Sequence, residues 1–258
     1  MQALREKFRI APVTVILCGA CVAVFLGEYF LMVTGRRQLL GLLALSGEGL
    51  ARGWWWTPVT HLFVHANLLH LAVNVLGLWF IGPEVETMLG RTRFLVLYLV
   101  SGIAGGLLQT AFSAPQSELV GASGSVCGVL LSFTTAYPEM PLRALLFFIL
   151  PVSMKAKTLG RGLIVFSAIC AALRLFPQLG HLAHLGGAVA GALLTKFWLP
   201  SSPRPRPLAS MSDADRVAES EELLRRLSEE GIEALSREEQ RRLVRLSERS
   251  RPRGGGRW

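Results

Sequence analysis

The stretch Leu119-Val-Gly-Ala-Ser-Gly-Ser-Val-Cys-Gly-Val-Leu130 places a serine, Ser123, among small residues inside an apolar run. Burying a hydroxyl group in such a run costs free energy unless the group has a partner. The run continues to about residue 137 and approaches the length of a membrane-spanning helix, which needs about 20 residues. The stretch therefore predicts a transmembrane helix that carries a polar group with a specific task.

The composition of the whole chain also indicates a membrane protein. Of its 258 residues, 51% are hydrophobic and 17% are charged, and the mean hydropathy is +0.43. These values are too apolar for an ordinary soluble domain. The net charge of +9 fits basic cytoplasmic loops and anionic lipid, so we expect the lipid bilayer as a partner and no nucleic acid.

Six apolar segments are predicted to span the membrane. They cover residues 12–33, 66–82, 94–113, 119–137, 159–176 and 180–199. The apolar piece Leu142–Val152 is too short to cross and contains Pro151, so we expect an interfacial or re-entrant segment there. The expected fold class is all-α, a polytopic membrane protein with a bundle of six transmembrane helices and a small helical cytoplasmic tail.

Basic residues in the short connections predict the orientation, because Lys and Arg resist translocation. The second and fourth connections are basic, whereas 113–118 and 177–180 contain no Lys or Arg. Arg36, Arg37 and Arg52, in the long first connection, oppose this pattern. We expect both termini in the cytoplasm and the protein in a bacterial inner membrane.

Five regions follow from these segments. They are an N-terminal cytoplasmic tail (1–11), a six-span domain (12–199), a Pro/Ser/Arg linker (200–211), a helical hairpin (212–250) and a disordered C-terminus (251–258). Ser212 is the expected cap of the first hairpin helix, which Gly231 ends, and Ser236 with Glu239 forms a capping box for the second. The hairpin either docks on a partner or the membrane surface, or it remains solvated; its partner is unknown.

Three polar residues fall at a common depth. With the N-terminus inside, spans two, four and six run from outside to inside, and His70, Ser123 and His184 each lie about four residues into their span. That position is about 6 Å below the outer boundary. Asn74 shares a helical face with His70, so two donors can point at one oxygen. A serine, a histidine and two further donors have the composition of a serine hydrolase site.

Glycines on the same spans predict close helix contacts. Gly187 and Gly191 share the face of His184, so a helix can approach there as closely as a hydrogen bond to Ser123 requires. Gly124 and Gly128 lie more than a right angle away from Ser123 around their helix. We therefore expect these two glycines to serve a different helix contact.

In their order along the chain, these residues resemble the motifs of the rhomboid intramembrane serine proteases. The matching elements are Gly121-Ala122-Ser123-Gly124, then His70 and Asn74 preceded by His61 and His65, then Ala183-His184 with Gly187 and Gly191, and finally Glu86 and Gly90 at the entry to the third helix. The resemblance covers about residues 54–199. The chain departs from the family at Thr57, which follows Trp56 where members often carry arginine.

The resemblance implies a rhomboid-like six-helix bundle that hydrolyses a peptide bond in or near a substrate's transmembrane helix. Ser123 would be the nucleophile and His184 the general base. His70, Asn74 and the backbone N–H of Ser123 would stabilise the oxyanion. The expected substrates are single-span membrane proteins whose helices contain breakers near the outer interface. The residues that bind the substrate are unknown, and no cofactor or metal is expected; the four cysteines are interpreted as packing residues.

Two other interpretations remain open. A non-catalytic rhomboid-like scaffold would bind transmembrane helices without cleaving them, although such a protein would be expected to lack the serine or the histidine. A transporter would use buried histidines for protons or metal, with Glu28 as the accompanying intramembrane carboxylate. The histidines available to it are His61, His65, His70 and His184.

Overall fold

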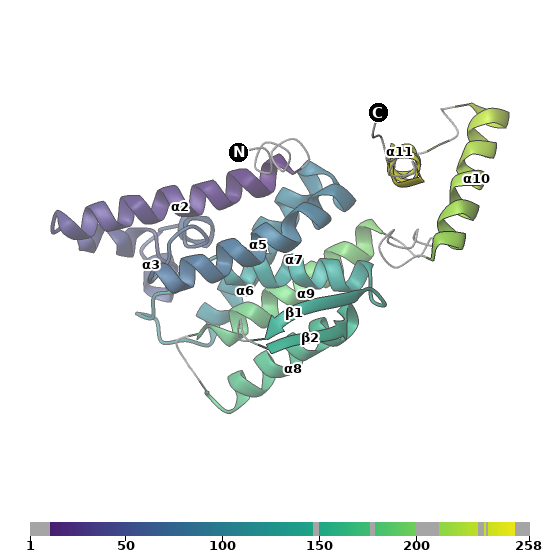
Figure 1. The fold of residues 1–258 in the computed structure, drawn as a ribbon. Coiled ribbons are helices and arrows are strands. Elements are labelled where there is room, and N and C mark those ends of the chain that lie inside the picture. Colours follow the sequence, from purple (N-terminus) through teal and green to yellow (C-terminus); the bar gives the residue numbers. More distant parts are fainter. Residues whose placement is uncertain are drawn as a thin grey trace. The chain divides into compact units, whose positions relative to one another are not determined.

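The structure, a computed structural model, describes residues 11–146, 150–175, 179–199, 212–231, 235 and 237–250. The chain divides into two compact units, Met1–Ser202 and Pro203–Trp258. Figure 1 shows the elements of both. The expected linker 200–211, the C-terminus 251–258, residues 1–10 of the N-terminal tail and Ser236 of the second capping box lie outside the described residues.

In the described part of the first unit, a helix coincides with each predicted apolar segment. These helices are α2 (Pro12–Val33), α5 (Leu68–Leu89), α6 (Arg91–Ala111), α7 (Ser123–Ala136), α8 (Ala156–Ala172) and α9 (His181–Trp198). Among the described helices, α2, α5 and α6 are long and apolar enough to cross a membrane, and α7 is a shorter apolar helix. Three short helices fold the connection between α2 and α5: η1 (Arg37–Leu42), α3 (Gly47–Ala51) and α4 (Thr57–Thr60).

The start of the fourth segment differs from its prediction. Residues 119–122 are not helical: Leu119 forms an isolated β-bridge with Leu45, and Gly121 has a φ of +118°, which is outside the helical region. Ser123 is therefore the first residue of α7 and not about four residues inside it, as predicted. The bridge depends on a contact with the distant first connection, which hydrophobicity along the chain does not reveal.

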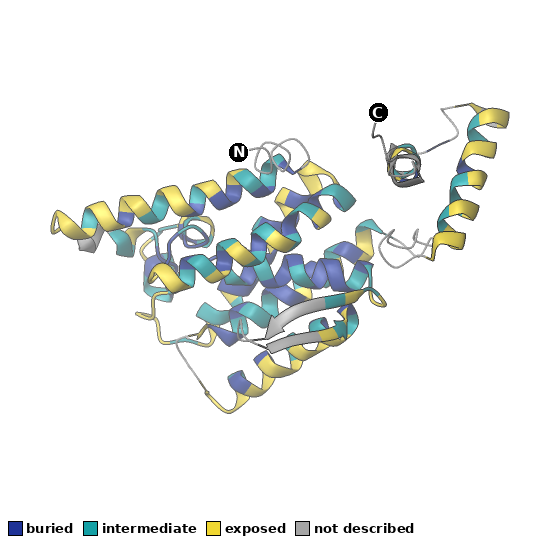
Figure 2. Ribbon diagram, in the orientation of Figure 1, coloured by how far each residue is buried: buried dark blue, intermediate teal, exposed yellow. Residues whose placement is uncertain are grey.

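The helices α7 and α9 pack against each other and against α6 and α8 (Figure 1). Figure 2 shows α7 largely buried, whereas α2 and α8 present exposed faces. A Cβ atom at Gly187 would lie 2.1 Å from the carbonyl oxygen of Gly124, and one at Gly191 would lie 2.2 Å from that of Gly128. The two helix backbones therefore touch along these glycines.

The prediction that Gly124 and Gly128 serve a different helix contact is confirmed in part. A Cβ atom at Gly128 would lie 2.2 Å from the Oγ of Ser101 on α6, and one at Gly124 would lie 3.7 Å from the Cα of Gly102 on α6, while the backbones of both also meet the glycines of α9. Ser123 approaches His184 beside the same crossing. The glycines of α7 thus make room for both α6 and α9, which a count of helical angles on one isolated helix does not reveal.

Glu86 on α5 connects this helix to the beginning of α2. Its carboxylate accepts hydrogen bonds from the backbone N–H groups of Val13 and Thr14, at 3.0 and 2.8 Å, and from the hydroxyl of Thr14 at 2.8 Å. These N–H groups lie in the first turn of α2, where a helix lacks internal acceptors. Helix α5 continues through Pro83 to Leu89, beyond residue 82, where the predicted span ends.

The segment between α7 and α8 is a β-hairpin. The sequence analysis expected a re-entrant or interfacial segment here and an all-α fold, so the strands are a departure from the expected secondary structure. Strand β1 (Pro141–Leu146) pairs antiparallel with β2 (Leu150–Lys155). Pro151 lacks an N–H and is tolerated in an edge strand better than inside a helix. At the base of the hairpin, Lys155 and Lys157 donate to Glu139 and lower the pKa of its exposed carboxyl to about 2.

Thr57 occupies a buried position in the first connection. Its hydroxyl donates to the carbonyl of Trp54 at 2.8 Å, while the indole N–H of Trp56 donates to the carbonyl of Leu42 at 2.7 Å. These bonds hold the segment of the tryptophan triplet without the arginine that the resemblance implies after Trp56. The indole of Trp55 is 75% exposed, as is usual for tryptophan at a membrane interface.

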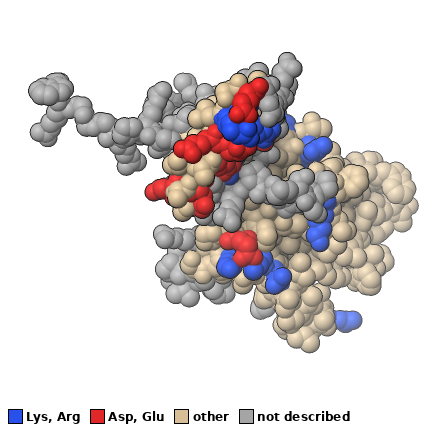
Figure 3. All heavy atoms as spheres, turned by 90° about the vertical axis from the view of Figure 1, so that its right-hand side faces the viewer, with Lys and Arg blue, Asp and Glu red and all other residues tan. Residues whose placement is uncertain are grey.

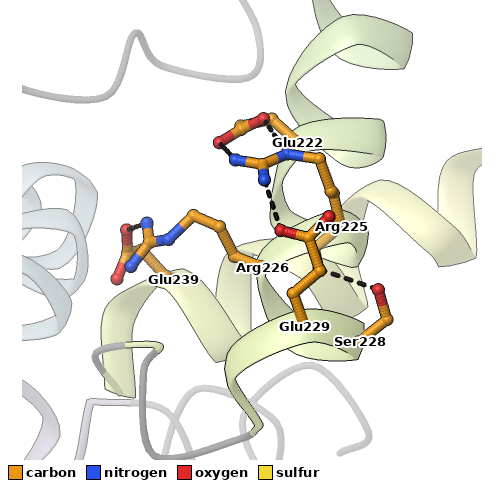
Figure 4. A network of polar contacts seen from close by, with 6 residues as sticks. All are labelled: Glu222, Arg225, Arg226, Ser228, Glu229 and Glu239. Carbon is orange, nitrogen blue, oxygen red and sulfur yellow. Dashed lines mark hydrogen bonds and ion pairs between the residues drawn. The ribbon is translucent and has the colours of Figure 1, made fainter.

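In its described part, the second unit contains two helices, α10 (Asp213–Glu230) and α11 (Arg237–Ser250). Ser212 and Asp215 form a capping box at the start of α10. Leu223, Leu235 and Leu246 form a small buried cluster between the helices. Figure 4 shows the polar contacts around them, in which Arg226 of α10 binds Glu239 of α11.

Charged side chains are unevenly distributed over the surface. On the face drawn in Figure 3, they gather in a few patches, and most of the other described surface there is uncharged. This distribution fits a chain whose first unit is largely embedded in lipid.

Candidate active site

The nucleophile predicted from the sequence lies at the beginning of α7. Gly121 precedes Ser123 by two residues, and its φ of +118° is one that residues with a Cβ rarely adopt. Its N–H donates to the carbonyl of His61 at 2.8 Å, which anchors the segment to the first connection. Ser123 is thereby presented at the N-terminal end of a helix, where backbone N–H groups lack intrahelical acceptors.

His184 lies in the first turn of α9, and its Nε2 is 2.9 Å from the Oγ of Ser123. The N-terminus of α9 is held by Gln109 of α6, whose side-chain oxygen accepts the N–H groups of Leu182 and Ala183 at 3.1 and 3.4 Å. The predicted pair is therefore in direct hydrogen-bond contact. The neutral tautomer with a free Nε2 lone pair can accept the serine proton.

His70 lies against the turn that precedes the serine. A Cβ atom at Gly121 would be 2.6 Å from the Nε2 of His70, so only a glycine leaves room for the imidazole there. The ring of His65 contacts that of His70, with 5.2 Å between the ring centroids. The imidazole of His70 therefore packs against Gly121, two residues before Ser123 in the sequence. A hydrogen-bond donor for a reacting carbonyl would be needed at this place.

Asn74 is buried one helical turn below His70. Its Nδ2 donates to the carbonyl of His70 at 2.8 Å, so one amide N–H is used within its own helix. A carboxamide nitrogen carries a second N–H. The sequence analysis expected the side chains of His70 and Asn74 to point at one substrate oxygen. Only one N–H of Asn74 is left for that contact.

Two further histidines support the site from the connection before α5. The Nδ1 of His61 lies 2.9 Å from the carbonyl of Thr57, and the backbone N–H of His65 donates to Glu28 at 3.2 and 3.4 Å. Burial lowers the pKa of both imidazoles to about 4. Both are therefore neutral at neutral pH, and they act as packing and hydrogen-bonding groups.

The described residues include no group of three or more His, Cys, Asp or Glu side chains that could hold a metal ion. The histidines considered for a transporter thus do not converge on a metal site within the part of the chain that is described. The four cysteines are buried, and none of them forms a disulfide bond among the described residues.

Two polar residues near the site were missed by the sequence analysis. Gln109 caps α9, and His181 contacts His184 edge to face, with 6.1 Å between the ring centroids. Glu28, which the sequence analysis considered only for a transporter, holds the His65 amide. His181 precedes His184 by three residues and so shares its helical face, a signal that was available in the sequence. The contact of Gln109 with α9 is long-range and had no local signal.

The chain is similar to several known proteins. A family model described as the Rhomboid domain matches residues 52–201. The chain is 32% identical over 160 residues to the rhomboid protease GluP of Bacillus subtilis (strain 168), a match that covers 61% of this chain and 29% of GluP. It is 28% identical over 202 residues to the rhomboid protease GlpG of Yersinia pestis (strain Pestoides F).

The match to GlpG covers 77% of this chain and 66% of GlpG, so the chain spans less than two thirds of the length of either relative. The domain match nevertheless includes more than half of this chain, together with Ser123, His184, His70 and Asn74. Apolar helices of membrane-spanning length accompany it. The chain therefore belongs to the rhomboid family and is an integral membrane protein.

Proposed function

We propose that this protein is an intramembrane serine protease that hydrolyses a peptide bond in or near the transmembrane helix of a single-span membrane protein. The observation that carries the proposal is the 2.9 Å contact between the Nε2 of His184 and the Oγ of Ser123. That distance suits transfer of the hydroxyl proton to the imidazole. The two relatives named rhomboid proteases support the same activity.

Ser123 attacks the scissile carbonyl carbon while the Nε2 of His184 takes the hydroxyl proton. A bond forms between Oγ and the carbon, and the carbonyl oxygen gains the electron pair. His184 then gives the proton to the leaving amine as the C–N bond breaks. Water attacks the resulting ester by the same proton transfers, which frees Ser123 and releases the second product.

The negative oxygen of the intermediate needs donors. The backbone N–H of Ser123 lies at the positive end of the α7 dipole, and His70 lies against Gly121 beside it. The remaining N–H of Asn74 completes the proposed set. In comparable soluble enzymes, removing one such donor costs about 3 to 4 kcal/mol of transition-state stabilisation.

The proposed organisation follows the sequence. We assign six spans to α2, α5, α6, α7, α8 and α9, with both termini in the cytoplasm of a bacterial cell and the site near the outer leaflet. Regions 1–11, 12–199, 200–211, 212–250 and 251–258 are the proposed tail, catalytic domain, linker, helical hairpin and C-terminus. The proposed substrate is a transmembrane helix with helix-breaking residues near the outer interface. Such a helix unwinds more readily there and so exposes its peptide bonds to the nucleophile.

The experiment is cleavage of a model single-span substrate by the purified protein in liposomes. Wild type is compared with Ser123→Ala, His184→Ala and the control Ser125→Ala, which removes a buried hydroxyl from the same helix. We expect both site variants to lose at least about a thousandfold in rate, and the control to retain cleavage. Equal cleavage by all four proteins would contradict the proposal, and substrate binding without cleavage by the wild type would favour a scaffold.

A further inference from the structure

The imidazole of His184 has no carboxylate to orient it. In a Ser-His-Asp triad, a buried carboxylate accepts a hydrogen bond from the Nδ1 of the histidine and holds the ring in place. Helix α9 contains no Asp or Glu, and within the described part of the chain the Nδ1 of His184 has no hydrogen-bond partner. Another contact must therefore limit rotation of the ring, if the Nε2 is to stay directed at the Oγ of Ser123.

The ring of His181 supplies such a contact from the preceding turn of α9. The two imidazoles meet edge to face, with 6.1 Å between their centroids and 90° between their planes. This separation lies in the range in which aromatic rings attract each other. Helical side chains lean toward the N-terminus, so the side chain of His184 extends over the turn that carries His181, three residues earlier. Among the described residues, no other ring contacts that of His184.

The ring of His181 is itself held in place. His181 is only 5% exposed, and its ring also meets that of Phe166, with 6.1 Å between the centroids and 80° between the planes. Phe166 belongs to α8, which packs against α9 (Figure 1). The rings of Phe166, His181 and His184 therefore form a series of contacts that runs from α8 to the dyad.

His181 makes these contacts with its ring and not with its polar atoms. Both of its ring nitrogens are shielded from solvent and have no hydrogen-bond partner among the described residues. Unpaired buried polar atoms cost free energy, so they do not explain a stabilising role for this side chain. The property of His181 that its neighbours use is a flat aromatic ring. A phenyl ring offers the same kind of edge-to-face contact without the polar atoms.

We infer that His181 is a positioning residue for the general base. Its ring, supported by that of Phe166, holds the imidazole of His184 in the orientation from which the Nε2 takes the proton of Ser123. The inference rests on the proposed protease function. It gives His181 no contact with the substrate, so the loss of its ring lowers kcat and leaves KM nearly unchanged.

The test compares His181→Phe with His181→Leu in the liposome cleavage assay. Both variants remove the ring nitrogens and keep an apolar side chain in the buried position, but only the first keeps an aromatic ring. We expect His181→Leu to lower kcat about tenfold, because misorientation of a reacting group is costly, while KM changes less than about twofold. We expect His181→Phe to keep kcat within about threefold of the wild type.

Phe166→Leu tests the outer end of the ring series. It removes the support of His181 without changing α9, so its kcat should lie between that of the wild type and that of His181→Leu. Phe197→Leu is the matched control, because Phe197 is 79% exposed on α9 and its ring contacts no other ring among the described residues. The kcat of this control should equal that of the wild type.

Two kinetic results would overturn the inference. One is an equal kcat in His181→Phe and His181→Leu, since the ring would then make no difference. The other is a loss in His181→Leu that appears in KM and not in kcat. Absence of any Ser123-dependent cleavage by the wild type would instead overturn the proposed function.

A second measurement does not depend on activity. In NMR spectra of protein with isotope-labelled histidine, the ring C–H signals of His184 are assigned by their loss in His184→Ala. We expect one narrow set of these signals in the wild type and in His181→Phe. In His181→Leu they should broaden or double, because the released ring exchanges between orientations. Signals of unchanged number and width in His181→Leu would overturn the inference.

Discussion

The carboxylate of Glu86 accepts both the backbone N–H and the hydroxyl of Thr14, each at 2.8 Å, and so joins α5 to the first turn of α2. Glu86 is only 2% exposed. Substitution by Gln keeps the shape of the side chain but weakens the hydrogen bonds it accepts, because charge-assisted bonds are stronger. We expect Glu86→Gln to lower the free energy of unfolding by about 1 to 3 kcal/mol, measured by thermal denaturation in detergent.

Glu84 provides the control for this prediction, because it is exposed on the same helix two residues earlier. Glu84→Gln should leave the melting temperature nearly unchanged. Equal melting temperatures for the Glu86 variant, the Glu84 variant and the wild type would show that the contact with α2 does not stabilise the fold.

The contact between Gly187 and Gly124 predicts a strong effect of a single methyl group. A Cβ at Gly187 would lie 2.1 Å from a carbonyl oxygen, so Gly187→Ala must push α9 away from α7. We expect a loss of about 1 to 3 kcal/mol in stability and at least a tenfold loss of proteolytic rate, since small displacements of reacting groups are costly. Rate and melting temperature are measured on the same protein preparation.

Gly162 on α8 is the matched control, because nothing lies within 4 Å of a Cβ placed there. Gly162→Ala should keep its activity and gain up to about 1 kcal/mol of stability from helix propensity. A Gly187 variant that behaves like the Gly162 variant would contradict the close helix crossing.

The sequence predicted the pairing of Ser123 with His184 because both lie near the outer ends of spans that run in the same direction. It also identified His70 and Asn74, since a spacing of four residues fixes a common helical face. It did not reveal that α7 starts at Ser123 or that the glycines of α7 meet α9 as well as α6. Those features depend on contacts between distant segments, such as Leu45 with Leu119, that local periodicity does not encode.

The buried histidine His61 predicts a pH dependence of stability. Burial lowers its pKa from 6.5 to about 4 in the folded protein, so between these values the unfolded chain binds more protons. Stability is therefore full above about pH 6.5 and falls as the pH decreases toward 4, by about 1.4 kcal/mol per pH unit for each such group. His65 contributes in the same direction.

Melting temperatures between pH 7.5 and 4.5 test this, with His61→Asn as the comparison. Asparagine offers an N–H in place of the Nδ1 that contacts Thr57 but does not titrate. The variant should lose less stability than the wild type on acidification. An identical pH dependence in both proteins would rule out His61 as a source of the acid sensitivity.

The second unit predicts a contribution from ion pairs between its helices. Arg242 of α11 binds Glu219 of α10 with both side chains partly buried, whereas Glu229 binds Arg225 within α10. In the full-length protein, Glu219→Gln should increase amide hydrogen exchange in α11, and Glu229→Gln should not. Equal exchange in the two variants would show that the pair with Arg242 does not hold the helices together.

The central claim is that Ser123 is a nucleophile activated by His184, and its most direct test is the site of covalent labelling by a serine-reactive fluorophosphonate. We expect peptide mass spectrometry of the purified protein to find the adduct on Ser123. Labelling should be retained in Ser125→Ala and reduced at least a hundredfold in His184→Ala. Wild-type protein that remains unlabelled at Ser123, or labelling that is unchanged without His184, would contradict the account.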